Sequence, residues 1–236
     1  VAWDNNANTA CNSVLQAVPG TPAKCESGRV QTGLRLYPDY GDAPDSYGTT
    51  LANNGAANIV SPAGFRLGFG ADPEPDGQPS ADALGDDNDV TGTPPGNLGS
   101  DDEDGVLFFV NGTVDPSTTP VQVVAGTTQI ILLAAFGGDN VTGTPDSVVS
   151  AWFDWNRDGD FLDAGEAVLV NHPLDGASGG FLNTVIISVP GTATPGPTFA
   201  RFRLTRGGTG STNSDSPTGL SGEGEVEDHP LTIVNN

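Results

Sequence analysis

The apolar segments of this chain are short, and turn-forming residues separate them. The sequence contains 33 glycines and 19 prolines, and no stretch of about 12 residues keeps a helical period of apolar side chains. Residues 198–206 instead alternate, because Phe202 and Leu204 share one face and Arg201 and Arg203 share the other. Disordered chains are also rich in Gly and Pro, but they lack the apolar segments that recur here. Short alternating segments joined by turns predict an all-β fold, a β-sandwich with long loops rich in Asp, Gly and Pro.

Nine segments have the composition of strands. They are residues 30–36, 106–110, 121–124, 128–136, 147–154, 167–170, 181–189, 198–206 and 231–234. The first belongs to residues 1–36, which hold few carboxylates and the only two cysteines, Cys11 and Cys25. A disulfide between these cysteines would close a short loop and contribute about 3 kcal/mol. The alternative is two free thiols. We expect a disulfide-stapled lead-in over residues 1–36 and one ligand-binding domain over residues 37–236.

The charge of the chain is strongly negative. It has 30 Asp and Glu against 8 Lys and Arg, a formal net charge of −22 at pH 7. A protein without a basic stripe cannot displace the counterions of nucleic acid, and it is not drawn to anionic lipid. Asp outnumbers Glu, and the short Asp side chain is typical of loops that hold hard cations. The charge therefore excludes nucleic acid and membrane as partners and favours calcium as a cofactor, with several ions bound.

The loop 154–166 has the spacing of a calcium site. Side-chain oxygens recur at alternate positions, Gly159 stands where the turn is sharpest, and a glutamate ends the loop. The glutamate lies one position later than in the helix-loop-helix calcium motif, and the flanking segments read as strands. The expected ligands are Asp154, Asn156, Asp158, Asp160, Asp163 and Glu166. An Asp- and Gly-rich turn capped by its own side chains is the alternative.

Further carboxylates form clusters outside this loop. We expect calcium ligands among Asp42, Asp45, Asp72, Glu74, Asp76, Asp86, Asp87, Asp101, Asp102, Glu103, Asp104, Glu225, Glu227 and Asp228. Most belong to the span 72–105, which has almost no strand-forming run, and a loop of that length is functional or disordered. The alternatives are a solvated acidic loop for residues 101–104 and turn capping for Asp42 and Asp45.

Several short motifs occur in a fixed order along residues 37–236. They are Gly-Asp-Ala-Pro-Asp-Ser-Tyr at 41–47, Asp-Pro-Glu-Pro-Asp-Gly at 72–77, Asp-Asp-Glu-Asp-Gly at 101–105, the loop 154–166, and Gly-Glu-Val-Glu-Asp at 224–228. This series resembles the GEVED domain family. It is also similar to the calcium-dependent peptide-binding domains of large bacterial RTX adhesins. His229 departs from the family pattern, in which a tyrosine follows the acidic pair.

The resemblance implies a calcium-dependent adhesion module of a bacterial surface or secreted protein with a role in biofilms. Such a module is extracellular, monomeric within a larger chain, and binds the C-terminal ends of peptides from surface proteins on host or neighbouring cells. Asp101, Asp102 and Asp104 are the expected ligands of a calcium ion that meets the peptide carboxylate, and the loop 154–166 is expected to be structural. The alternatives are a calcium-stabilised spacer and a carbohydrate-binding module.

Catalytic motifs are missing from the sequence. It contains no Gly-x-Ser-x-Gly, His-Glu-x-x-His or phosphate loop, and no glutamate stands alone in an apolar run. His172 and His229 lack the spacing of zinc ligands. We therefore expect a protein that is not an enzyme. Arg201 and Arg203 could hold a ligand carboxylate, but internal ion pairing is the favoured role in so acidic a chain.

Overall fold

The computed structural model describes residues 38–61, 64–85, 103–110, 113–115, 120–137, 147–174, 181–207 and 213–236. The chain divides into two compact units, Val1–Arg35 and Leu36–Asn236, and all the described residues belong to the second. Some expected features lie outside the described residues. They are the strand 30–36 and the residues Cys11, Cys25, Asp86, Asp87, Asp101 and Asp102. The cysteine bridge stays a prediction.

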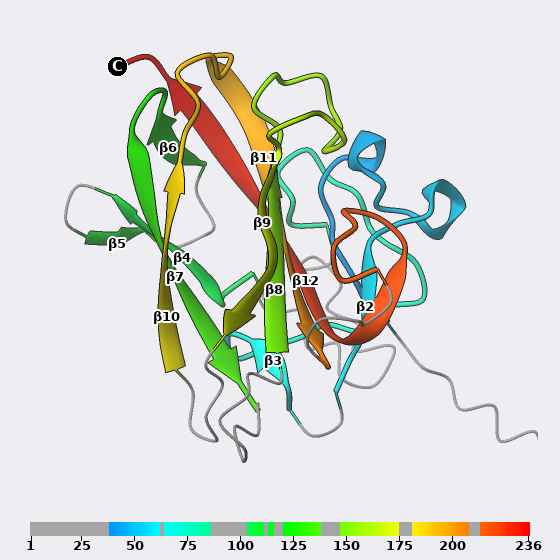
Figure 1. Cartoon of the computed structure of the whole chain (residues 1–236). Helices are drawn as coiled ribbons and strands as arrows, with labels where there is room; N and C mark the ends of the chain where they lie inside the picture. The colour runs from blue at the N-terminus through cyan, green and yellow to red at the C-terminus, as the bar shows by residue number, and fades with distance from the viewer. Residues whose placement is uncertain are drawn as a thin grey trace, which may run out of the picture. The chain divides into compact units, whose positions relative to one another are not determined.

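The strands of the described residues form two sheets (Figure 1). The larger sheet has the order β1-β2-β12-β11-β8-β9, and β6 pairs with β12 in parallel. Its strands are β1 (Pro38–Tyr40), β2 (Ala57–Ile59), β6 (Val121–Val124), β8 (Ser147–Phe153), β9 (Ala167–Leu174), β11 (Gly196–Arg206) and β12 (Leu220–Val234). The longest ladder joins β11 to β12, and β8 flanks β11 on the other side.

The smaller sheet has the order β10-β7-β4-β5, and β3 pairs with β7. Its strands are β3 (Arg66–Leu67), β4 (Val106–Val110), β5 (Thr113–Asp115), β7 (Thr128–Phe136) and β10 (Phe181–Ser188). Two short 3-10 helices, η1 (Asp45–Tyr47) and η2 (Leu51–Asn53), lie between β1 and β2.

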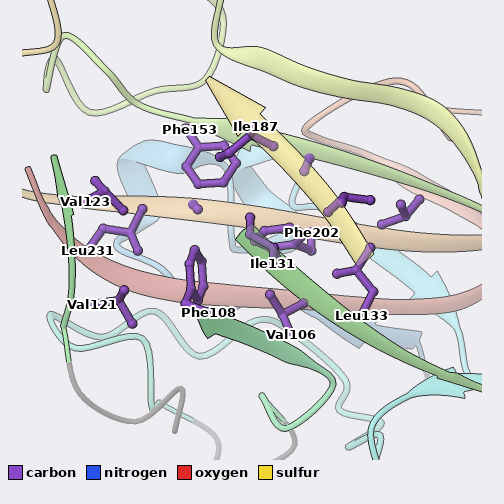
Figure 2. Close-up of a cluster of buried hydrophobic side chains, with 14 of the residues drawn as sticks. Val106, Phe108, Val121, Val123, Ile131, Leu133, Phe153, Ile187, Phe202 and Leu231 are labelled. Atoms are coloured by element: carbon purple, nitrogen blue, oxygen red, sulfur yellow. The ribbon is translucent and has the colours of Figure 1, made fainter. Parts of the chain in front are cut away.

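One hydrophobic core fills the space between the two sheets (Figure 2). It forms because alternate residues of each strand point inward. Phe108 of β4 meets Phe202 of β11 edge to face, with 6.1 Å between the ring centroids. Ile131 of β7 and Phe153 of β8 are fully buried in the same cluster. The predicted all-β sandwich is confirmed, whereas its loading with calcium stays a prediction.

The sequence pattern predicted one strand that is much shorter than the strand in the structure. The prediction 231–234 covers only the end of β12, which begins at Leu220 and includes the acidic motif 224–228. A run of Glu and Asp reads as loop, because charged side chains disfavour a buried strand. Here these side chains find partners inside the protein, as described below. Strand β9 likewise extends to Leu174, beyond the predicted end at residue 170.

Both faces of β11 are buried. Phe202 and Leu204 face the core, as the alternation predicts, but Arg201 and Arg203 on the other face also have no exposed surface. Hydrogen bonds from these arginines reach backbone carbonyls of Tyr47 and Ser216, so the segments before β2 and before β12 lie over the outer face of the larger sheet. These covering segments form part of the candidate ligand pocket, and the loop between β8 and β9 completes it.

Candidate metal centre and ligand pocket

The glutamates of the motif 224–228 tie the two sheets together. Glu225 accepts a hydrogen bond from the backbone N–H of Leu67 in β3. Glu227 accepts from the backbone N–H groups of Gly105 and Val106 at the start of β4, both at 3.0 Å. Both carboxylates are buried. Since β12 belongs to the larger sheet and β3 and β4 to the smaller one, each glutamate holds the sheets in register.

His229 completes the contact at Glu227. Its Nε2 lies 3.1 Å from a Glu227 carboxylate oxygen, and its ring meets Phe108 and Phe202 edge to face. Burial raises the pKa of Glu227, although the hydrogen bond with His229 acts in the opposite direction. His229 therefore fills an inward position of β12 and is part of the core contact rather than a surface ligand.

Asp228 faces the opposite side of β12 and pairs with Arg201. The Arg201 Nε and Nη2 atoms each donate to one Asp228 oxygen at 2.7 Å, and neither side chain is exposed. The N–H of Ala43 donates to the same carboxylate at 2.8 Å. The internal ion pairing expected for Arg201 is confirmed, and it engages both oxygens of Asp228.

Arg203 has a different set of partners. Within the described part of the chain, Arg203 donates to backbone carbonyls, including those of Asn213 at 2.9 Å, Ser216 at 2.7 Å and Ala57 at 3.1 Å. Burial, and then the neighbouring charge of Arg201, lower the pKa of Arg203 to about 9. Arg203 thus organises the loop before β12, and it does not present its charge to a ligand.

Carboxylates in the first half of the domain also hold backbone N–H groups. Asp42 is buried and accepts from Gly85 at 2.5 Å. Asp45 accepts from the Thr50 backbone N–H at 2.9 Å and from the Asn53 side chain at 2.7 Å. The bond from Thr50 is the main cause that lowers the pKa of Asp45. The contacts of Asp45 are local and have the form of a turn cap, whereas Asp42 and Gly85 are 43 residues apart, so their hydrogen bond is a tertiary contact.

The three residues of the expected clamp, Asp72, Glu74 and Asp76, have different hydrogen-bond partners in the structure, and calcium binding there stays a prediction. Glu74 is buried and accepts from the backbone N–H of Tyr40, whereas Asp76 accepts from the backbone N–H of Leu51 at 2.6 Å. Asp72 is buried, and its own N–H donates to Asp39. Asp39 was not singled out from the sequence, yet it is buried and also accepts from Val226 of β12.

Two of the four consecutive carboxylates at 101–104 are described. Glu103 is buried, and Asp104 accepts a hydrogen bond from the backbone N–H of Phe69 at 2.7 Å. Asp104 therefore fixes the segment that follows β3. The expectation that it also meets a peptide ligand stays untested.

The ends of the loop 154–166 are closed by carboxylates that accept hydrogen bonds. Asp154 accepts from the Gly159 N–H at 3.1 Å and from the Tyr47 hydroxyl at 2.7 Å. Glu166 accepts from the Trp155 N–H at 3.1 Å and from the Asp163 N–H at 3.2 Å. Burial, followed by the charges of Asp154 and Asp158, raises the pKa of Glu166 to about 7. A carboxylate in such surroundings gains from a nearby cation.

Three carboxylates converge in the middle of this loop. Oxygen atoms of Asp158, Asp160 and Asp163 lie within 4.8 Å of one another, the one such group found among the described residues. Calcium–oxygen distances of about 2.3–2.6 Å let one ion touch three oxygens at this spacing. The Asn156 amide lies beside these carboxylates: its nitrogen donates to Asp158 at 3.2 Å and to Asp163 at 2.5 Å, and its oxygen accepts from the Asp158 N–H at 2.9 Å. This donor set fits calcium.

A pocket of about 380 Å³ opens beside this cluster. Asp160, Phe161 and Leu162 form one wall, and Asp45, Tyr47, Asn53 and Thr218 belong to the other sides. Phe161 packs against Tyr47 with 4.7 Å between the ring centroids, and Leu162 is 72 % exposed. The pocket therefore joins an apolar lining to the edge of the acidic cluster.

Tyr47, Phe161 and Leu162 line the pocket although no local sequence pattern points to a role for them. Tyr47 ends the motif 41–47, which is the signal that could have located it. Its hydroxyl donates to Asp154, and burial, followed by this hydrogen bond, raises the pKa of Tyr47. Phe161 and Leu162 lie inside the loop 154–166, whose alternate carboxylates predict a calcium site but give no signal for an apolar pocket wall. Contacts between segments more than 100 residues apart are not visible in a local pattern.

Comparison with known proteins supports one family. Residues 148–232, from β8 to β12, match the GEVED domain. That stretch is less than half of the chain, and it contains the calcium-like loop and the motif 224–228. No curated protein matches the chain.

One similar solved structure is the seventh ScaB type I cohesin from Pseudobacteroides cellulosolvens. It is 11 % identical, and the match covers 50 % of this chain and 89 % of that chain with a TM-score of 0.24. A TM-score this low carries no information about function. Within the described residues, no helix is long and apolar enough to cross a membrane.

Proposed function

We propose that this chain is a calcium-dependent binding module, not an enzyme, and that its ligand is the C-terminal end of a partner's peptide chain. The observation that carries the proposal is the pocket of about 380 Å³ that shares Asp160 with the three-carboxylate cluster. This location differs from the expectation based on Asp101, Asp102 and Asp104, which gave the loop 154–166 a structural role only.

The calcium ion would be held by Asp158, Asp160 and Asp163, with Asn156 as a further oxygen donor. An ion there supplies the positive charge that a ligand carboxylate requires, because Asp45 and Asp160 on the pocket walls repel an anion. Calcium takes six to eight oxygens, so three carboxylates and one amide leave positions for water or ligand. A pocket with one charged edge and an apolar lining suits the last residues of a peptide.

The apolar wall would select the side chain next to the carboxylate. Leu162 is largely exposed, and Phe161 is held in place by Tyr47. Exposed leucines that line a pocket contribute binding energy when a ligand covers them. A peptide of a few residues buries little area, so we expect affinities near micromolar. Adhesion to neighbouring cells and a location at a bacterial surface are part of the same proposal and rest on the resemblance to RTX adhesins.

Calorimetry with peptides decides between this function and its alternatives. An array of peptides with free C-termini selects a ligand, and the selected peptide is then compared with its C-terminal amide, in calcium and in EGTA. We expect the amide to lose about 2–5 kcal/mol of binding free energy and EGTA to abolish binding. Equal affinity of acid and amide would favour a sugar-binding module, and no binding to any peptide would favour a spacer.

A matched pair of variants tests the pocket itself. Leu162→Ala removes an exposed side chain from the pocket wall, and Val170→Ala removes one of similar exposure from β9, outside the pocket. We expect Leu162→Ala to weaken peptide binding about tenfold and Val170→Ala to leave it unchanged, with both proteins equally stable. Equal affinities of the two variants would exclude this pocket as the ligand site.

A further inference from the structure

Strand β10 is an edge strand without the features that protect the other sheet edges. Edge strands of natural proteins are short, or carry Pro, charge or a bulge, because a bare edge pairs with other strands. β1 has three residues and begins with Pro38, and β5 has three residues and ends with Asp115. β9 carries Pro173, and its ladder with β8 is interrupted by register shifts.

β10 differs from these edges in every respect. It runs for eight residues, Phe181–Ser188, with neither a charged residue nor a proline. Its ladder with β7 is continuous over all eight positions, without a bulge. Within the described residues β10 ends the smaller sheet, and Figure 1 shows it at the rim of that sheet. A long, regular and uncharged edge is a template for another strand.

The hydrogen bonds between β10 and β7 determine which backbone groups of β10 point away from the sheet. The Val189 N–H donates to the Thr127 carbonyl, so Val189 is a hydrogen-bonded position facing β7. Because these positions alternate along an antiparallel strand, Ile187 and Val185 also bond β7. The N–H and C=O groups of Leu182, Thr184 and Ile186 therefore point away from the sheet, toward a further strand.

The outer face of the smaller sheet is apolar beside this edge. Leu182 and Ile186 are 61 % and 67 % exposed. The register aligns Ile186 with Ile130 of β7 and Phe109 of β4, so an apolar row crosses three strands. The outward positions of β10 and their partners on β7 carry no charge, although the protein has a net charge of −22. Two copies of this face can therefore approach without placing like charges opposite each other.

We propose that two copies of this chain pair through β10, antiparallel and around a twofold axis at Thr184. Each Thr184 then faces its counterpart, and Leu182 of one copy faces Ile186 of the other. The paired residues exchange both backbone hydrogen bonds, as in any antiparallel ladder. Leu182 and Ile186 are similar in size and share one face, so the strand is complementary to itself, as a twofold interface requires. This proposal is independent of the proposed function, and it replaces the expectation of a monomeric module.

The dimer would be weak and favoured by salt. One strand edge buries less than the ~1,200 Å² of a stable interface, and two protomers of charge −22 repel each other. Raising the ionic strength from about 0.1 M to about 1 M shortens the Debye length from about 10 Å to about 3 Å. We therefore expect the dimer dissociation constant to fall as salt is added. A basic partner molecule on the same edge would show the opposite salt dependence.

Sedimentation velocity of the full chain with calcium, at increasing protein and salt concentrations, tests the dimer. Two variants address the edge: Ile186→Lys puts a charge on it, and Thr184→Pro removes an outward N–H without touching the ladder to β7. Val170→Lys on β9 is the control, since Val170 is also exposed and apolar. We expect both β10 variants to raise the dimer dissociation constant at least about tenfold and the control to leave it unchanged.

Three results would overturn the proposal. They are a wild-type chain that stays monomeric up to millimolar concentration in high salt, a dimer that salt weakens, and a dimer that Ile186→Lys and Thr184→Pro leave intact. Circular dichroism establishes that each variant is folded. If Thr184→Pro fails to fold, Ile186→Lys decides alone, because a lysine at an exposed edge position leaves the core unchanged.

Discussion

Arg201 and Asp228 form a fully buried, bidentate ion pair on the outer face of the larger sheet. Both hydrogen bonds measure 2.7 Å, and the two residues are directly opposite each other in the ladder between β11 and β12. Arg201 also donates to the carbonyl groups of Tyr47 and Gly48 at 2.9 and 2.8 Å. The pair thus holds the segment that carries the pocket onto the sheet.

Breaking this pair should destabilise the domain strongly. Arg201→Met leaves the Asp228 carboxylate buried without its countercharge, which costs about 3–5 kcal/mol, a large part of a typical domain stability of about 5–15 kcal/mol. Chemical denaturation in calcium buffer measures the loss. Arg206→Met is the control, since Arg206 pairs with Glu223 in a part-exposed salt bridge that is worth at most about 1 kcal/mol. Equal losses in the two variants would contradict the structural role of Arg201.

Calcium should stabilise the fold through the loop 154–166. Extracellular calcium modules bind at about 10⁻⁴–10⁻³ M, and an ion at about ten times its dissociation constant adds roughly 1.4 kcal/mol. We expect EGTA to lower the melting temperature and magnesium not to restore it. Asp158→Ala should remove much of the response to calcium. Asp215→Ala, at an exposed position that is neither in the loop nor in the three-carboxylate cluster, should keep it. A melting curve indifferent to the chelator would argue against any structural calcium.

Glu166 should give the calcium-free protein a distinctive pH dependence. Burial raises the pKa of Glu166 in the folded protein to about 7, from its ordinary value of 4.5. The folded state therefore binds this proton more tightly than the unfolded state, so stability falls as the pH rises from about 4.5 to about 7. Glu166→Gln removes this loss while it keeps an oxygen that can accept from Trp155.

The comparison is made between wild type and Glu166→Gln at each pH, because the other carboxylates contribute to both proteins. In EGTA we expect the difference in unfolding free energy to shift in favour of Glu166→Gln between pH 4.5 and pH 7. In calcium we expect wild type to be the more stable protein at neutral pH, because the cation compensates the carboxylate charge. A difference that does not change with pH in EGTA would show that burial does not control Glu166.

A methyl group at Gly105 should disturb the junction of the two sheets. An added Cβ would lie 2.3 Å from the Gly68 nitrogen, 2.4 Å from the Leu67 Cβ and 2.6 Å from a Glu227 oxygen. Overpacking of this kind costs about 1–3 kcal/mol, and Gly105→Ala also displaces the N–H that Glu227 accepts. Gly191→Ala is the control, because its nearest neighbour would be at 3.9 Å. Thermal unfolding in calcium should give a clearly lower melting temperature for Gly105→Ala than for Gly191→Ala.

Cys11 and Cys25 should be bridged. Intact mass before and after reduction should differ by one hydrogen atom on each sulfur, and alkylation of the native chain without reductant should not proceed. Full alkylation under those conditions would show two free thiols. We expect loss of the bridge to leave the melting temperature of the domain at residues 37–236 unchanged, because the motif series begins at residue 37.

Local patterns were sufficient for the core strands. The runs 106–110, 121–124 and 128–136 coincide with β4, β6 and β7, because strand side chains alternate between core and outer face with a period of two. The same pattern missed β1, β2, β3 and β5, which have two or three residues each. Strands that short are held by their neighbours in the sheet rather than by their own composition.

The sequence by itself determined the sandwich class, the strongly acidic surface and the loop whose carboxylates gather around Asp160, because all three follow from residue type and local spacing. Only the tertiary structure decided the partners of the other acids. Glu227 meets Gly105, and Asp228 meets Arg201, across long stretches of chain. A carboxylate can accept a backbone N–H, pair with an arginine or bind an ion equally well, and which of these it does depends on what the fold brings beside it.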